Sequence, residues 1–294
     1  MSNIEDQNAF RKAAAMFMDR KKPRIAYGGG NHSPLGVAIS VGDRETLSMV
    51  QEAISAKRLR LAYQPVMLAT DPSRVAFYEG LIRVLDQTGR VIPAKDFMAT
   101  VETRDLGRQI DCAALELALA TLARRPELRL SVNMSARSIG YAPWVQILRR
   151  GLSVAPNIGA RLILEISESS ATLLPEIVGQ FMDQLQGAGV AFALDDFGSG
   201  HLAIRYFRDY AFDILKMDAQ FVRGVDKDRH SYALARALLS IGKSFDMVTV
   251  ANAVETQAEA QILQALGVDC LQGYLFGAPS LQPAFELTSA QKPA

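Results

Sequence analysis

Short apolar runs that each end in a polar or acidic cluster recur along this chain, and each is followed by an amphipathic segment. In the downstream two thirds they are Leu128–Asn133, Arg161–Glu165, Val190–Asp195, Ile214–Asp218, Met247–Asn252 and Cys270–Phe276. The intervening segments predict helices over residues 142–153, 172–187, 229–245 and 256–266. Buried strands that alternate with helices are typical of parallel sheets built from βαβ units. This alternation constrains the fold more than any other feature.

Two further extended runs, Leu59–Met67 and Val75–Val84, come earlier, with a turn expected at Asp71-Pro72-Ser73. With them the chain has eight predicted strands over roughly 235 residues, which suits a closed (β/α)8 barrel. The alternative is an open doubly wound sheet, which would carry a glycine-rich fingerprint after its first strand. No such fingerprint is present, so we expect an α/β barrel.

Helical patterns cover Thr46–Lys57, with Asp43 as the expected cap, and Arg104–Arg124, which stops at Pro126. A short helix is also expected over residues 9–20, followed by a linker rich in glycine at residues 28–34. No Gly-Lys-Ser/Thr follows those glycines, so they do not form a phosphate loop. We expect an N-terminal extension of residues 1–42, a main domain of residues 43–285 and a C-terminal tail of residues 286–294.

Composition excludes several classes of protein. With 32 Lys and Arg against 31 Asp and Glu, the net charge of +1 gives no sign of binding to a nucleic-acid polymer. Two cysteines, Cys112 and Cys270, exclude a disulfide scaffold and favour a reducing compartment. Three scattered histidines make a His-built metal site improbable, so any metal ligands should be oxygens. No apolar run is long enough for a membrane span and no signal peptide is visible, so we expect a cytoplasmic protein.

Polar residues stand at the ends of the predicted strands. They are Glu79, Asn133, Glu165 with Glu168, Asp195-Asp196, Lys216 with Asp218, Asn252 with Glu255, and Gln272. Each alone has an ordinary explanation as a helix cap or a solvated surface group. In a barrel, however, these strand ends converge on one mouth, where the acids would repel one another unless a cation lay between them. Carboxylate and amide oxygens of this kind bind Mg²⁺ or Mn²⁺.

The same residues favour phosphodiester chemistry. The adjacent Asp195 and Asp196 would let one carboxylate bridge two ions, and paired ions about 3.5–4 Å apart activate water and stabilise the transition state of phosphodiester hydrolysis. Lys216 would orient that water or offset the developing negative charge. Arg83, four residues after Glu79, would hold a phosphate oxygen. The residues alone therefore give the hypothesis of a metal-dependent phosphodiester site.

Eight ordered motifs in residues 43–285 resemble those of the EAL domain family. They are Tyr63-Gln64-Pro65, Glu79-Gly80-Leu81-x-Arg83, Ser131-Val132-Asn133-Met134-Ser135, Leu164-Glu165-Ile166-Ser167-Glu168-Ser169, Asp195-Asp196-Phe197-Gly198-Ser199-Gly200, Leu215-Lys216-Met217-Asp218, Val254-Glu255-Thr256 and Gln272-Gly273-Tyr274. EAL domains are cyclic di-GMP phosphodiesterases, which convert a bacterial second messenger into linear pGpG. The resemblance implies a modified TIM barrel with its first strand antiparallel to the others, and roles in biofilm and motility control.

The resemblance also implies roles for individual residues. The metal ligands would be Glu79, Asn133, Glu165 and Asp195, with Asp196 completing a second metal position. Lys216 would contact the catalytic water. The nucleotide would be bound by Arg83, at a phosphate, and by Gln64, Gln272 and Glu255 in the pocket. Glu168 and Glu255 resemble the acids that hold the loop after Asp195-Asp196 in its active geometry.

One departure from the family pattern bears on catalysis. Active members read Ala-Glu-Gly-Val-Glu-Thr near the seventh strand, whereas this chain reads Ala251-Asn252-Ala253-Val254-Glu255-Thr256. An amide at Asn252 coordinates a metal through its carbonyl oxygen but carries no charge and accepts no proton. Even outer-shell changes at metal sites cost about 10–100-fold in affinity or activity, and we expect at least that here.

Other departures are His201-Leu202-Ala203, where the family has Tyr-Ser-Ser, and Val84-Leu85-Asp86, in place of a tryptophan-rich stretch. Gly80 replaces the alanine of the motif that names the family, a change we expect to be benign.

Three interpretations stay open at this stage. The first is a receptor that binds cyclic di-GMP with weak or no hydrolysis. The retained Arg83, Gln64, Glu79 and Gln272 support binding, and Asn252 argues against efficient turnover. The second is an active phosphodiesterase with Mg²⁺ or Mn²⁺, in which one metal position or both are occupied. The third is a protein-interaction scaffold. A homodimer formed through the barrel and a further protein partner are expected in addition, without contact to a membrane or a nucleic-acid polymer.

Overall fold

The computed structural model describes residues 34–155, 157–200, 206–207 and 210–286. The chain divides into two compact units, residues Met1–Gly42 and Asp43–Ala294, and the second holds the barrel. The helix expected at residues 9–20, most of the glycine-rich linker and His201-Leu202-Ala203 lie outside the described residues.

The strands are short and buried, with one long hairpin at the start. They are β1 (Leu59–Leu68), β2 (Asp71–Leu85), β3 (Val91–Pro93), β4 (Leu130–Asn133), β5 (Leu162–Ser167), β6 (Ala191–Phe197), β7 (Ile214–Met217), β8 (Val248–Ala251) and β9 (Cys270–Gln272). The predicted strand positions are therefore confirmed, and β3 is an additional short strand.

The helices fall between the strands as the sequence predicts. They are α2 (Pro34–Ser55), α3 (Met98–Val101), α4 (Asp105–Arg124), α5 (Ala142–Val154), α6 (Glu168–Ala171), α7 (Pro175–Gln186), α8 (Ala219–Val222), α9 (Arg229–Ser244) and α10 (Gln257–Leu266). Within the described part of the chain, none combines the length and apolar character that crossing a membrane requires.

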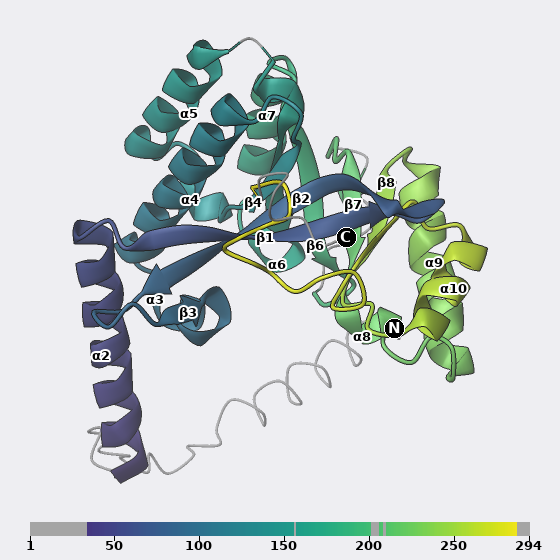
Figure 1. The fold of residues 1–294 in the computed structure, drawn as a ribbon, viewed down its shortest axis with the longest axis horizontal. Coiled ribbons are helices and arrows are strands. Elements are labelled where there is room, and N and C mark those ends of the chain that lie inside the picture. Colours follow the sequence, from purple (N-terminus) through teal and green to yellow (C-terminus); the bar gives the residue numbers. More distant parts are fainter. Residues whose placement is uncertain (1–33, 156, 201–205, 208–209, 287–294) are drawn as a thin grey trace, which may run out of the picture. The chain divides into compact units, whose positions relative to one another are not determined.

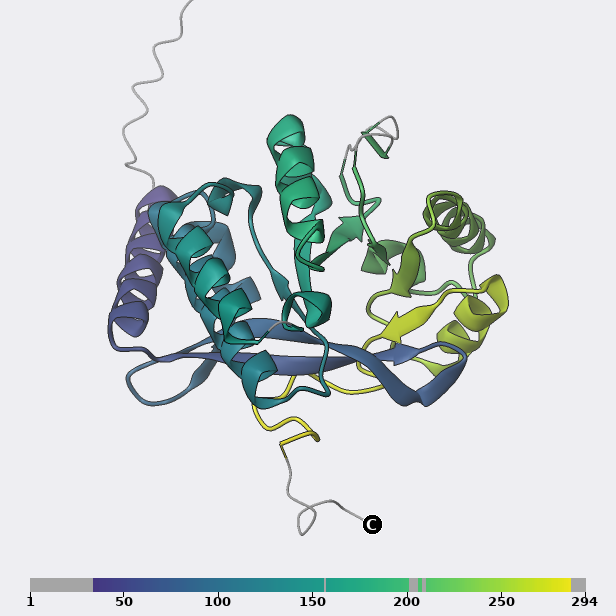
Figure 2. The same ribbon diagram turned by 90° about the horizontal axis from the view of Figure 1, so that it is seen from above.

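Strand pairing closes a barrel with one antiparallel strand. From β2 the order runs through β4, β5, β6, β7, β8 and β9 with parallel pairing, and β1 then pairs antiparallel with both β9 and β2. The short β3 adds to the outer edge of β2. Figure 1 shows the long β1 and β2 crossing the barrel, and Figure 2 shows them side by side along one edge. The predicted barrel, with its first strand antiparallel, is confirmed.

Side chains alternate between the two faces of each strand, and this alternation places the polar residues inside the barrel. Ile163 in β5 and Ile214 in β7 belong to the cluster of apolar residues in the barrel interior. Side chains two positions apart on a strand share a face. Glu165 and Lys216, each two residues beyond one of these isoleucines, therefore point inward above an apolar floor, while Leu164 packs outward in the larger core. A short interior apolar layer thus positions the polar layer at the mouth.

Three sequence-based boundaries were wrong. The helix α2 begins at Pro34, because proline is compatible with the first turn of a helix, so Asp43 lies inside the helix rather than at its cap. The residues Asp71-Pro72-Ser73, expected to form a turn, begin β2, and the turn falls at residues 69–70.

The third boundary is the end of the last strand, which stops at Gln272 instead of continuing to Phe276. At Gly273 the chain passes so close to Val254 that a β-carbon would lie 2.0 Å from the Val254 carbonyl oxygen. Only glycine permits that approach, and it redirects the chain out of the sheet.

Candidate functional site

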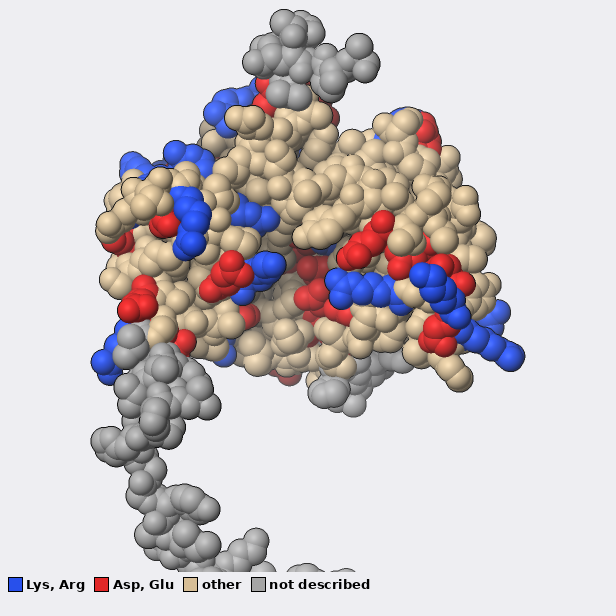
Figure 3. Space-filling model, turned by 60° about the horizontal axis from the view of Figure 1, so that its bottom comes forward, with Lys and Arg blue, Asp and Glu red and all other residues tan. Residues whose placement is uncertain are grey.

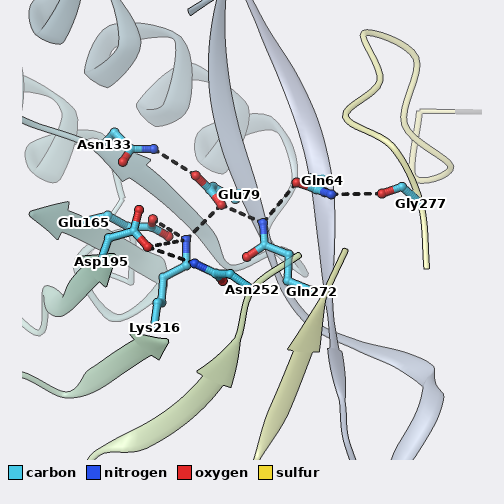
Figure 4. Close-up of polar contacts among 9 residues, drawn as sticks. All are labelled: Gln64, Glu79, Asn133, Glu165, Asp195, Lys216, Asn252, Gln272 and Gly277. Carbon is cyan, nitrogen blue, oxygen red and sulfur yellow. Dashed lines mark hydrogen bonds and ion pairs between the residues drawn. The ribbon is translucent and has the colours of Figure 1, made fainter. Parts of the chain in front are cut away.

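A buried lysine occupies the centre of the barrel mouth. The ammonium of Lys216, only 1% exposed, lies 2.9 Å from Glu79 Oε2, 2.5 Å from Glu165 Oε2 and 3.5 Å from Asp195 Oδ1. The four residues come from β7, β2, β5 and β6, so the barrel itself brings them together (Figure 4). Sequence analysis placed all four at one mouth, and the structure brings them into direct contact. We refer to them as the carboxylate cluster.

Amide side chains complete the surroundings of Glu79. Asn133 Nδ2 donates to Glu79 Oε1 at 2.9 Å, and Gln272 Nε2 donates to Glu79 Oε2 at 2.6 Å. Gln272 also donates to Gln64 Oε1 at 3.2 Å, and Gln64 Nε2 donates to the carbonyl of Gly277 at 3.0 Å (Figure 4). Gln272 therefore anchors Glu79 directly, Gln64 holds Gln272, and both glutamines line a cavity.

The electrostatics of the cluster leave an excess of negative charge. Burial would raise the pKa of Glu79, but Lys216 and the amide donors bring that pKa below its ordinary value. Burial and the neighbouring Glu79 raise the pKa of Glu165. Burial opposes the charge of Lys216, yet Asp195, Glu165 and Glu79 hold its pKa well above the ordinary value. One ammonium thus faces three carboxyl groups, which is an arrangement that an added cation would stabilise.

Unpartnered oxygens mark where a cation fits. Glu165 Oε1 and Asn252 Oδ1 are buried without a hydrogen-bond partner. Oxygens of carboxylates and amides are the ligands that Mg²⁺ and Mn²⁺ prefer. In the described part of the chain, no three His, Cys, Asp or Glu side chains form a metal-binding group by themselves. The amide oxygens would therefore have to complete any metal coordination.

Asn252 contacts the cluster through its nitrogen. Its Nδ2 donates to Asp195 Oδ1 at 3.1 Å (Figure 4). An ionised carboxylate only accepts hydrogen bonds, so the opposite amide orientation would place two acceptors against each other. The next residue, Ala253, has a positive φ of 58°, which is uncommon for a residue with a β-carbon. Asn252 therefore gives Asp195 a donor where a glutamate would give it a second negative charge.

The two adjacent aspartates lie where strand β6 becomes irregular. Regular pairing of β6 with β7 is interrupted between Leu194 and Phe197, and Asp196 has a positive φ of 54°. Asp195 contacts Lys216 within the carboxylate cluster, and both aspartates line one of the cavities that border the cluster. Burial and the neighbouring Asp195 raise the pKa of Asp196 to about 6.

Two cavities border the carboxylate cluster. The β9-side cavity has a volume of about 280 Å³ and is lined by residues that include Gln64, Asn252, Glu255, Gln272 and Tyr274. The α4-side cavity has a volume of about 370 Å³ and is lined by residues that include Asp111, Asn133, Ser135 and Asp196. Glu79 and Asp195 border both cavities. Figure 3 shows a hollowed face on which acidic side chains lie between basic ones.

The two supporting acids differ in what they hold. Glu168, at the start of α6, accepts hydrogen bonds from the backbone N–H groups of Gly198 at 2.7 Å and Gly200 at 3.1 Å. These glycines belong to the loop after Asp195-Asp196, as the resemblance implies. Glu255 was expected to hold the same loop, but its ion-pair partner among the described residues is Arg223, at 3.7 Å. Glu255 also lines the β9-side cavity.

Arg83 is not among the residues that line either cavity. It is half-buried in β2, its Nη1 donates to the carbonyl of Ile82 at 2.9 Å, and burial lowers its pKa. The negative charge of Glu79 partly offsets that effect. The guanidinium would have to turn from this backbone contact to reach a ligand phosphate.

Asp111 and Arg223 are among the cavity residues that sequence analysis missed. Asp111 in α4 is buried, lines the α4-side cavity and accepts hydrogen bonds from Ser138 Oγ at 2.6 Å and the N–H of Ser135 at 3.0 Å. The sequence pattern that could have identified Asp111 is an acidic residue among apolar residues of a predicted helix. Arg223 lines the β9-side cavity, and no sequence pattern set it apart from other surface arginines.

Comparisons with known proteins agree with this geometry. The EAL domain family model matches residues 47–279. The cyclic di-GMP phosphodiesterase PdeB of Shewanella oneidensis is 29% identical over 83% of this chain and 29% of its own length. The bifunctional diguanylate cyclase/cyclic di-GMP phosphodiesterase MucR of Pseudomonas aeruginosa is 29% identical over 84% of this chain and 36% of its own length. The chain thus spans about a third of these curated relatives.

Solved structures show the same barrel. The PaMucR phosphodiesterase, in a c-di-GMP complex, has a TM-score of 0.75 and 28% identity over 83% of this chain and all of that chain. The FimX EAL domain of Pseudomonas aeruginosa, bound to c-di-GMP, has a TM-score of 0.74 at 22% identity over 81% of this chain and 97% of that one, and it supports the fold alone. The family model covers most of the sequence. This chain belongs to the EAL domain family.

Proposed function

We propose that this protein binds cyclic di-GMP at the barrel mouth and hydrolyses it slowly or not at all. The relatives PdeB and MucR are named as cyclic di-GMP phosphodiesterases, and the PaMucR structure contains this ligand. A molecule with two guanine bases and two phosphates suits two cavities that share the carboxylates of Glu79 and Asp195. These features support ligand binding.

The hydrogen bond from Asn252 to Asp195 carries the second half of the proposal. In an active site, the residue at this position would have to supply charge to a metal and accept a proton from water. Asn252 does neither, because its nitrogen is committed to Asp195 and its oxygen is a neutral acceptor. We infer that binding is retained and that turnover falls by a factor of ten or more, on the order expected for changes around a metal site.

The donor atoms fit one Mg²⁺ or Mn²⁺. Glu165 Oε1 and Asn252 Oδ1 are free to accept a cation, and Asp195 lies beside both residues. When bound, the cation would polarise the phosphate and lower the pKa of an attacking water. Since the Asn252 amide adds no charge, we propose that a single metal position is occupied rather than two.

The remaining residues orient the ligand and control charge. Lys216 is held by three carboxylates, so its ammonium has a fixed position at the barrel mouth. Gln272 holds Glu79, Gln64 holds Gln272, and both border the β9-side cavity. Glu168 holds the loop that follows Asp196 through two backbone N–H groups. This pre-formed arrangement favours recognition.

An active phosphodiesterase is the second candidate function. One observation favours it: every other position assigned to catalysis lies at the same mouth, and Asp196, whose pKa is raised to about 6, borders it from the α4 side. Asp196 would then serve as the proton acceptor that Asn252 cannot be. A homodimer through the barrel and a further protein partner remain predictions.

Two measurements on the same protein test the proposal. Cyclic di-GMP is titrated in Ca²⁺, which commonly blocks this type of hydrolysis, and pGpG formation is followed by chromatography in Mn²⁺. We expect saturable binding with little product. Rapid pGpG formation would contradict the receptor proposal and support an active phosphodiesterase. Absence of binding would contradict both and leave the interpretation as a protein-interaction scaffold.

A pair of arginine variants provides the internal control. Arg83→Ala should weaken binding, because it removes the charge-assisted contact assigned to a phosphate. Arg149→Ala removes an exposed arginine of α5 that borders neither cavity, and it should leave the affinity unchanged. Equal affinities for both variants would contradict the assignment of Arg83.

A further inference from the structure

Arg223 lines the β9-side cavity, although no sequence motif marked it. We propose that Arg223 is an additional ligand-binding residue, whose guanidinium contacts a phosphate of the nucleotide seated in that cavity. The inference rests on the proposed function, that an anionic cyclic dinucleotide occupies the barrel mouth.

The cavity needs an available cation. Its lining carries the acidic side chains of Glu79, Asp195 and Glu255, which would repel a phosphate. Lys216 also lines it, but this ammonium is 1% exposed and already contacts three carboxylates. Among the described residues that line the β9-side cavity, Arg223 is the cation with free capacity.

The contact that Arg223 makes is easily exchanged. Its side chain is 64% exposed and its Nη2 lies 3.7 Å from Glu255 Oε1, which is 49% exposed. An exposed ion pair at this distance contributes little stability, since water screens both charges. A phosphate offers two oxygens to the planar guanidinium and forms a stronger, bidentate contact. The pair with Glu255 would therefore hold the side chain at the rim until a ligand replaces it.

The backbone beneath Arg223 is held in place. Arg223 follows α8, and its N–H donates to the carbonyl of Ala219 at 3.0 Å. The buried carboxylate of Glu259 accepts hydrogen bonds from the N–H of Gly224 at 2.9 Å and from that of Glu255 at 3.0 Å. One side chain of α10 thus fixes the backbone of Glu255 and of the residue that follows Arg223. Because the backbone is fixed, only the arginine side chain has to move on binding.

The test is a titration of the full chain with cyclic di-GMP in Ca²⁺ at low and at high salt. Arg223→Ala should weaken binding about tenfold at low salt, as expected for loss of a charge-assisted hydrogen bond. Arg223→Lys keeps the charge but lacks the planar guanidinium, so its affinity should lie between those of wild type and Arg223→Ala. The difference between wild type and Arg223→Ala should shrink at high salt, because ions screen the contact. The matched control, Arg149→Ala, should bind like wild type.

The outcomes separate this inference from the proposed function. If wild type fails to bind, the proposed function is wrong and this inference falls with it. If wild type binds and Arg223→Ala binds equally well, Arg223 has no ligand contact and the proposed function stands. A loss that is the same at all salt concentrations would show a structural effect and overturn the inference. Thermal unfolding of each variant checks folding, and Arg223→Gln replaces the alanine variant if the latter is unstable.

Discussion

At the scale of single residues, the distinctive contact is the hydrogen bond from Asn252 to Asp195. It links a neutral amide to a carboxylate that already lies 3.5 Å from Lys216. Asp195 therefore faces the ammonium of Lys216 and the amide N–H of Asn252, and both stabilise its negative charge. This makes the mouth less dependent on a bound cation than one lined by a further glutamate.

Replacing the amide by a carboxylate should make the stability of the protein depend on metal. In Asn252→Glu the contact with Asp195 becomes repulsive, which costs about 2 kcal/mol, the scale of a hydrogen bond to a charged group. In a chelator, Tm should fall by about 4–8 °C. Mn²⁺ should restore it, with a larger gain than in wild type, as measured by thermal unfolding. The neutral variant Asn252→Gln is the control, and a chelator-treated Asn252→Glu as stable as wild type would contradict this reasoning.

At the scale of elements, apolar runs identified every strand of the barrel, because strands buried on both faces are apolar almost throughout. The short elements β3, α6 and α8 were not predicted, since three or four residues carry too little periodicity. Their positions follow from contacts that form only in the fold. Side-chain capping at Asp218 for α8 is one example, where its carboxylate accepts from the N–H of Gln220 at 2.8 Å.

A buried arginine shows how an element boundary is stabilised. Arg161 Nη1 donates to the carbonyls of Arg125 at 2.9 Å and Leu128 at 3.1 Å, and its Nη2 donates to that of Leu122 at 2.9 Å. These carbonyls lie in the last turn of α4 and in the segment that leads into β4. At the end of a helix no following helical N–H group is available to bond them. Arg161→Lys cannot reach all three, so unfolding in urea should show a loss of about 2–4 kcal/mol. Arg149→Lys on the exposed face of α5 should change stability by less than about 0.5 kcal/mol, and equal effects would refute the capping role.

At the scale of the whole molecule, closure of the barrel turns scattered strand ends into one site. That convergence was predictable, because a parallel barrel places all strand carboxyl ends at the same mouth. The position of Lys216 within contact of three carboxylates was not, nor was the pairing of Glu255 with Arg223. Both depend on the directions of individual side chains, and the contact of Lys216 with Asp195 depends in addition on the irregularity in β6 after Leu194. No pattern in the sequence predicts either.

The buried Asp111 gives the molecule a pH dependence with a definite sign. Burial raises its pKa to about 7, against an ordinary value of 3.8 in the unfolded chain. Between these values the folded state holds a proton that the unfolded state has lost, so stability falls as the pH rises from about 4 to 7. Asp111→Asn removes this term and keeps an oxygen for Ser135 and Ser138. The variant should therefore be more stable than wild type at pH 8, by up to about 4 kcal/mol.

Urea unfolding across this pH range measures the difference between the two proteins. The curves of wild type and Asp111→Asn should approach each other near pH 4, where both side chains are neutral. A constant difference at every pH would mean that Asp111 does not titrate in this window.

The central claim, that Asn252 limits hydrolysis while binding is retained, is tested most directly by the rate of pGpG formation in Mn²⁺. Wild type and Asn252→Glu are compared at saturating cyclic di-GMP, with affinities measured separately in Ca²⁺. The account predicts a rate at least tenfold higher for Asn252→Glu, because the variant regains a charged ligand and proton acceptor. A wild-type rate that the substitution does not raise would contradict it.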